Sequence, residues 1–139
     1  MDFTRRDALI LGAGAATAAL LPVQAFASAS DDAIAAFTGG APTSDSGIEL
    51  TAPEIAENGN TVPVAVSAPG AVSVILIATG NPNPDVCTFN FGPLSGAQFG
   101  STRMRLAGTQ TLIAVAKMAD GSFAQTSSIV KVTIGGCGG

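Results

Sequence analysis

From Ile48 to Ile134 the chain is a series of short runs rich in valine, isoleucine and threonine, and turn residues separate one run from the next. Runs of this length and composition are typical of β-strands. Seven strands are predicted: 48–51, 61–68, 71–79, 86–91, 98–106, 111–118 and 122–134. The pair Ser127-Ser128 is a candidate break in the last of them. This pattern predicts an all-β domain, and its strand number favours an immunoglobulin-like antiparallel β-sandwich over a barrel.

The segments between these runs carry specific turn signals. They are Pro69-Gly70, Asn81-Pro82-Asn83-Pro84, Gly92-Pro93, Gly108 and Asp120-Gly121. Proline fixes φ and glycine accepts a positive φ, so both favour a reversal of the chain. Asp120-Gly121 is the clearest hairpin signal, because an Asp-Gly pair suits the tight turns that join antiparallel strands.

The N-terminus predicts an export signal over residues 1–27. Arg5 and Arg6 precede the apolar stretch Ala8–Leu21, and small residues lead to a cleavage site after Ala27. The stretch is shorter than the ~20 residues that span a bilayer, so we expect no membrane attachment after cleavage. The paired arginines favour the twin-arginine route to the periplasm, which carries folded proteins. The alternative is an ordinary secretory signal in which the two arginines are coincidental.

A short helix is predicted over Asp31–Phe37, with Ser30 as its N-cap and Gly39-Gly40 ending it. The predicted organisation is therefore a signal peptide, a segment of helix and polar linker, one sandwich domain and a C-terminal arm. The boundaries are 1–27, 28–47, 48–134 and 135–139.

The residue inventory excludes several classes of chemistry. The chain contains no histidine, tyrosine or tryptophan, which removes histidine-based triads and histidine zinc sites, and its two cysteines form no CxxC pair. We therefore expect no resident cofactor or metal. The net charge of −4 argues against nucleic-acid binding. Glu49, Glu54 and Glu57 lie in a polar segment and are interpreted as surface charge rather than catalytic carboxylates.

The chain ends in Gly135, Gly136, Cys137, Gly138 and Gly139. Glycine is costly to order, so this flexible arm is not expected to stabilise a fold. Extended backbone would carry Cys137 roughly 10 Å beyond Ile134, about the depth of an enzyme pocket. No neighbour in the sequence activates the thiol, so its chemistry must be driven by other proteins. This pattern predicts a covalent carrier and not an enzyme; the alternative is a frayed terminus.

Alternation separates the second cysteine from the first. Cys87, Phe89 and Phe91 share one face of the predicted strand 86–91, and the two phenylalanines indicate that this face is buried. Cys87 is then a small, inert core residue. A disulfide between Cys87 and Cys137 is the competing interpretation.

Three features together resemble the SoxY family, the cysteine-bearing subunits of the SoxYZ sulfur carrier in bacterial thiosulfate oxidation. They are the Gly-Gly-Cys-Gly-Gly terminus after Val132-Thr133-Ile134, the segment 52–64 and the twin-arginine leader. The resemblance implies that Cys137 binds sulfur species covalently, with the four flanking glycines as its arm. It implies a heterodimer with a SoxZ subunit, which would be exported with this chain. It also implies partner enzymes: a haem-containing conjugating enzyme, a manganese hydrolase and a sulfane dehydrogenase.

Other functions remain open on the sequence. A structural or adhesive sandwich could use Cys137 for an intermolecular disulfide. A redox enzyme acting alone would show turnover without partners. A metal chaperone could use Cys137 with Met104 and Met118, although methionines are more often packing residues.

Overall fold

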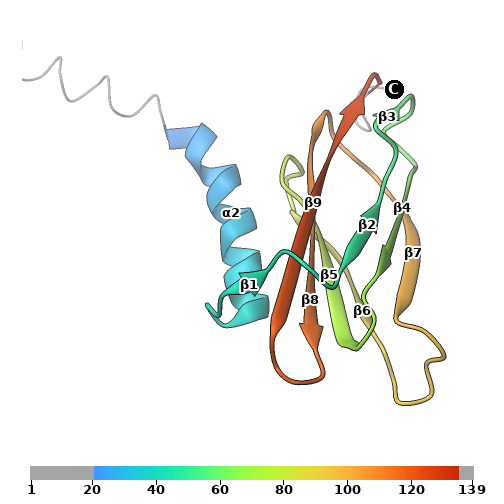
Figure 1. Cartoon of the computed structure of the whole chain (residues 1–139). Helices are drawn as coiled ribbons and strands as arrows, with labels where there is room; N and C mark the ends of the chain where they lie inside the picture. Colours follow the sequence, from blue (N-terminus) through green and yellow to red (C-terminus); the bar gives the residue numbers. More distant parts are fainter. Residues whose placement is uncertain (1–20, 135–139) are drawn as a thin grey trace, which may run out of the picture.

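The computed structural model describes residues 21–134, so the start of the predicted leader and the predicted arm lie outside it. One helix precedes a series of strands (Figure 1). The elements are α2 (Leu21–Thr38), β1 (Thr43–Ser44), β2 (Glu49–Thr51), β3 (Ile55–Ala56), β4 (Val62–Ser67), β5 (Ala71–Ala78), β6 (Asp85–Asn90), β7 (Phe99–Met104), β8 (Gln110–Met118) and β9 (Phe123–Val132).

The strands form two sheets that face each other. The larger has the order β1-β9-β8-β5-β6, with β3 also paired to β9, and the smaller has the order β2-β4-β7. Pairing is antiparallel throughout except for β1 and β3, which run parallel to β9. The chain changes sheet after each of the strands β1 to β4 and again after β6 and β7, and such crossings between two sheets are typical of immunoglobulin-like sandwiches. The predicted sandwich is thus confirmed.

The main core lies between the sheets and consists of aliphatic side chains. Val62, Leu76, Leu106, Leu112 and Val130 are among its fully buried members. Alternation along β4 shows how the sequence achieves this, because its valines point inward and its other residues outward. Near the edge, the ring of Phe89 packs so closely on Gly100 that a Cβ atom there would lie 2.7 Å from it.

Helix α2 covers the outer face of the larger sheet (Figure 1). Ile34 and Phe37 pack against a second cluster that contains Ile77 and Val115, and Phe37 meets Phe123 edge to face at 6.1 Å between ring centroids. These helical contacts come from residues that follow Ala27, so a chain cleaved there would keep them. Within residues 21–134 no helix combines the length and the apolar character needed to cross a membrane.

The helix and two short strands differ from the sequence-based predictions. Ser30 is not an N-cap, because α2 includes it and the residues from Leu21 onward. The alanine-rich segment before Ser30 continues the helix, since alanine has the highest helix propensity. The end of the helix at Gly39-Gly40 is confirmed, and both glycines have positive φ, 67° and 82°.

The sequence analysis missed β1 and β3, which lie in segments predicted as linker or left unassigned. Each has two residues and is defined only by its parallel pairing to β9. The candidate break at Ser127-Ser128 was wrong, because β9 pairs with β8 through both serines without interruption. Their partners, Ile113 and Leu112, hold the backbone extended whatever the local propensity of serine.

Candidate functional site

The predicted attachment residue Cys137 and its flanking Gly135, Gly136, Gly138 and Gly139 lie outside the described residues. What the structure describes is the place from which this segment departs. We call residues 131–134 the arm root and the end of the sandwich where they lie the arm end. The arm root is the last part of β9 and the two residues after it (Figure 1).

Backbone hydrogen bonds hold the arm root on one side. The segment 54–59 runs beside it, and the N–H of Lys131 donates to the carbonyl oxygen of Glu54 at 2.9 Å. Thr133 N–H donates to Ala56 at 3.1 Å, and Gly59 N–H donates to the Ile134 carbonyl at 2.8 Å. Ile134, the last described residue, is therefore fixed by a segment far from it in sequence.

The loop between β7 and β8 holds the same region on the other side. The hydroxyl oxygen of Thr109 accepts the N–H of Val132 at 3.0 Å, and Leu106 N–H donates to the Gly59 carbonyl at 2.8 Å. The arm root thus has hydrogen-bond partners on both flanks, backbone groups of 54–59 on one and the Thr109 hydroxyl on the other. Because such bonds restrict the chain in both directions, they define where the predicted arm starts.

A buried glutamine ties two further loops together at this end. The side-chain oxygen of Gln110 accepts the N–H of Gly80 at 2.9 Å, and its amide nitrogen donates to Asn81 and to the Gly108 carbonyl, both at 3.0 Å. Asn81 in turn accepts the N–H of Ala107 at 3.0 Å. Gln110 is 8% exposed, so these bonds replace water at a position that solvent barely reaches.

The arm end also exposes apolar and acidic side chains. Ile55 on β3 and Ile134 just after β9 are 58% and 56% exposed. Glu49, Glu54 and Glu57 are all exposed, which confirms their interpretation as surface charge. No group of three potential metal ligands occurs within residues 21–134.

Cys87 lies on β6, an edge strand, and is half-buried rather than fully buried as predicted. The predicted face is otherwise correct, since Cys87, Phe89 and Phe91 all pack against the main core while Thr88 is exposed. Burial raises the pKa of the Cys87 thiol, which lowers its thiolate fraction and its reactivity. Cys87 is a free thiol in the described part of the chain.

The methionines of the metal-chaperone alternative are packing residues. Met104 is 4% exposed in the main core, and Met118 packs against the same core. A buried thioether is not available to bind a metal at the surface. The structure therefore contradicts that use of Met104.

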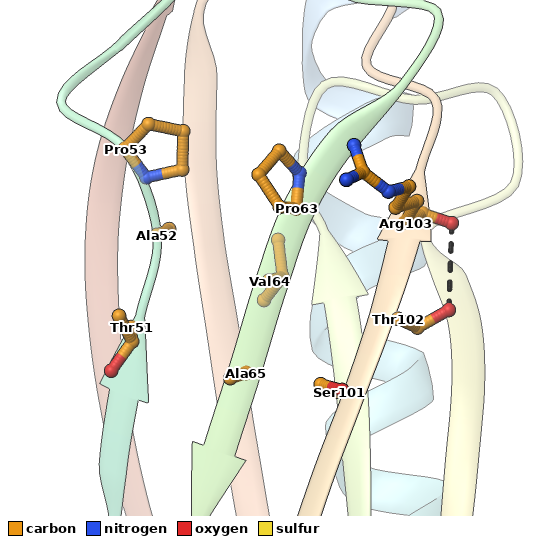
Figure 2. Close-up of a pocket in the computed structure, with 9 residues that line it drawn as sticks. All are labelled: Thr51, Ala52, Pro53, Pro63, Val64, Ala65, Ser101, Thr102 and Arg103. Atoms are coloured by element: carbon orange, nitrogen blue, oxygen red, sulfur yellow. Dashed lines mark hydrogen bonds between the residues drawn. The ribbon is translucent and has the colours of Figure 1, made fainter.

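The sequence analysis did not predict a groove on the outer face of the smaller sheet (Figure 2). It encloses about 650 Å³ and crosses β2, β4 and β7. Small outward side chains such as Ala65 and Ser101 form its floor, and Arg103 is the one charged residue lining it. Small residues at outward positions of a strand were the available signal, but which strands are neighbours depends on the fold.

Comparison with known proteins identifies the family. The model of the family described as "Sulfur oxidation protein SoxY" matches residues 34–137. Among solved structures, the sulfur carrier protein SoxY from Chlorobium limicola f thiosulfatophilum is 41% identical with a TM-score of 0.67, covering 78% of this chain and 99% of that one. No curated protein matches the chain.

More distant structures share only the fold. A superoxide reductase (neelaredoxin) from Ignicoccus hospitalis has a TM-score of 0.55 at 16% identity, covering 63% of this chain and 80% of its own. A hypothetical protein from Pyrococcus horikoshii OT3 has a TM-score of 0.51 at 13% identity, covering 68% and 99%. The family match spans every strand of the sandwich and reaches Cys137. This chain belongs to the SoxY family of sulfur oxidation proteins.

Proposed function

We propose that this chain is a periplasmic sulfur carrier of thiosulfate oxidation, which binds sulfur intermediates covalently through the thiol of Cys137. The observation that carries the proposal is the family match, which extends to residue 137 and so includes this cysteine. The fixed arm root supports it, because a tether is useful when its starting point is defined. Cys87 is the poorer candidate, since it is half-buried with a raised thiol pKa.

The loading step forms one bond and releases two electrons. The sulfur of Cys137 bonds to the outer sulfur of thiosulfate, giving a cysteine that ends in an S–S–SO₃⁻ group. The thiol proton is released to solvent, and the two electrons pass to a haem-containing partner enzyme. This chain supplies only the thiol, in keeping with the absence of histidine from its sequence.

Later steps would act on the carried group while it stays attached. Hydrolysis of the terminal S–SO₃⁻ bond by a manganese enzyme would release sulfate and leave a persulfide on Cys137. A sulfane dehydrogenase would then oxidise that outer sulfur, with water supplying the oxygen atoms, the dehydrogenase accepting the electrons and the protons passing to solvent. A SoxZ-like subunit, forming a SoxYZ complex with this chain, is the partner that family membership suggests.

Export by the twin-arginine route is part of the proposal. A cofactor-free domain gains from folded export when it is assembled with a partner that lacks its own signal. The intact mass of the protein recovered from the periplasm should correspond to a chain that begins at Ser28.

Intact mass spectrometry tests the carrier function against the structural alternative. The protein is incubated with its partner subunit, thiosulfate and the haem-containing enzyme, and measured with and without reductant. A carrier gains one S–SO₃⁻ group on the cysteine sulfur, which reductant removes. A mass equal to two disulfide-linked chains, with no sulfur adduct, would instead support the structural or adhesive function.

A further inference from the structure

Basic side chains are unevenly placed on the sandwich. Arg103 and Arg105 lie at the arm end of β7, and Lys131 lies at the arm end of β9. Lys117, at the other end, pairs with the first residue of β9. All four are exposed, and none forms an ion pair with a residue in the range 21–134. Three cations without carboxylate partners therefore lie at the end from which the predicted arm departs.

Two consecutive backbone hydrogen bonds connect the arm root to the residue that follows Arg105. Ile134 is bonded to Gly59, and Gly59 is bonded to Leu106, which directly follows Arg105. Hydrogen-bonded backbone segments lie about 4.8 Å apart. Two such spacings separate Ile134 from the backbone next to Arg105, a distance of roughly 10 Å. Cys137 is three residues beyond Ile134, which extended backbone covers in about 10 Å. A group on Cys137 is thus within reach of these side chains.

Two adjacent surface hollows lie along the same path. A smaller hollow of about 440 Å³ is lined by Ala56 and Glu57, the residues that bond to Thr133 in the arm root. It shares Pro53 and Pro63 with the larger groove over the smaller sheet. Glu57 puts a carboxylate beside the arm root, where it would repel an anion.

The larger groove, farther from the arm root, is lined by a positive charge instead. Figure 2 shows the Arg103 side chain beside Pro63, above the small residues Ala65 and Ser101. Arg103 pairs with Pro63 in the β4–β7 ladder, so its guanidinium lies on the outward face beside the shared prolines. No carboxylate lines this larger groove, so an anion that follows the path meets repulsion first and attraction at its end.

We propose that the guanidinium groups of Arg103 and Arg105 form an anion site for the sulfonate end of the group carried on Cys137. This inference rests on the carrier function proposed above and adds the residues that recognise the cargo. A guanidinium is always charged and presents N–H donors in a planar fork, which suits the oxygens of a sulfonate. The occupant is the chain's own segment 135–139 bearing its anionic group.

The first test uses thiol alkylation and no partner enzyme. In a Cys87→Ser background, Cys137 is the sole thiol, and its rates with anionic iodoacetate and neutral iodoacetamide are measured. The ratio of these rates cancels thiolate fraction and accessibility. For a thiol about 10 Å from both guanidinium groups at 0.01 M ionic strength, Arg103→Gln/Arg105→Gln should lower this ratio about two- to fourfold. High salt should abolish the difference.

Two matched controls make this test specific. Lys117→Gln removes one positive charge at the opposite end and should leave the ratio unchanged. Lys131→Gln removes a charge at the arm end on another strand, and its effect should be smaller than that of the arginine pair. An unchanged ratio in the arginine variant, or an equal fall in either lysine variant, would overturn the proposal.

The second test measures the bound state. Tetrathionate converts the Cys137 thiolate to the same S–S–SO₃⁻ group and releases thiosulfate, so the cargo can be installed without enzymes. The side-chain NMR signals of Arg103 and Arg105 should shift on loading, and that of Lys117 should not. Unshifted arginine signals would contradict the anion site even if enzymatic loading succeeds; failed enzymatic loading with shifted signals would contradict the carrier function alone.

Discussion

At the end of the sandwich opposite the arm root, the chain reverses through local turns. Gly70 and Gly121 have φ values of 84° and 86°, and the Asp120 carboxylate accepts both the N–H and the hydroxyl of Ser122. Long-range bonds also support this end, such as the one from Ala119 N–H to the Gly70 carbonyl at 2.9 Å. At the arm end, long-range hydrogen bonds hold the last described residues of the chain. The Thr133 hydroxyl donates to the carbonyl of Glu57, 76 positions away, and Gly80 N–H donates to Gln110, 30 positions away.

This difference indicates two ways of fixing a loop. A tight turn is specified by its own residues and needs no support from elsewhere. A loop held by distant partners is fixed only when the whole domain is folded. The predicted arm starts from the second kind of structure, so its point of departure is positioned by the sandwich as a whole.

The largest expected effect on stability comes from comparing two glutamines, Gln110 at the arm end and Gln98 at the opposite end. Gln110→Ala removes the partner of Gly80 N–H at a buried position, which should lower the free energy of unfolding by about 1–3 kcal/mol. Gln98→Ala at the opposite end removes a single exposed bond to Gly70 and should cost less than about 0.5 kcal/mol. Urea denaturation measures both; equal losses would show that the arm end does not depend on its long-range bonds.

The next effect comes from two glycines. Here the substitution at the opposite end should lower stability more than the one at the arm end. Gly121 has positive φ and an open space where a Cβ would lie, so Gly121→Ala tests backbone conformation alone and should cost about 1–2 kcal/mol. Gly108 at the arm end has the same open space without positive φ, and Gly108→Ala should be nearly neutral. Thermal unfolding compares them. A larger loss for Gly108→Ala would contradict the assignment of local turns to the far end.

The smallest effect concerns Asp120 and pH. Hydrogen bonds from the side chain and backbone of Ser122 lower the pKa of the Asp120 carboxyl below 3.8. Because the folded-state pKa is the lower one, the stabilisation is present above pH 3.8 and is lost as the pH falls through the folded value. NMR titration should show this pKa rising in Ser122→Ala; an unchanged pKa would mean that the turn does not depend on this contact.

The sequence predicted the sandwich because its signals are local. Valine-rich alternation marked the strand that became β4, and Asp120-Gly121 marked the hairpin between β8 and β9. Ser127-Ser128 misled because pairing with β8 overrides a weak local propensity. β1 and β3 had no local signal, since two residues become a strand only through a partner.

The candidate site likewise has features that the sequence predicts and features that depend on the fold. Cys137 stands out in the sequence through its flanking glycines, and family membership gives it a role to test. Apart from the Thr109 hydroxyl, the bonds that hold the arm root come from backbone groups of 54–59, mostly carbonyl oxygens that any residue could supply. Half-burial of Cys87 follows from the edge position of β6, which depends on strand order and not on alternation.

The most direct measurement replaces Cys137 with serine and follows sulfur loading and thermal stability in one protein, with Cys87→Ser as the matched control. Cys137→Ser should abolish the thiosulfate-derived adduct and leave the melting temperature within about 2 °C of the unsubstituted protein, because the predicted arm is not expected to contribute to the core and a substitution outside the core costs under about 0.5 kcal/mol. Cys87→Ser should load normally. An adduct that persists in Cys137→Ser, or a fall of many degrees in its melting temperature, would contradict a sulfur carrier whose thiol lies outside the folded body.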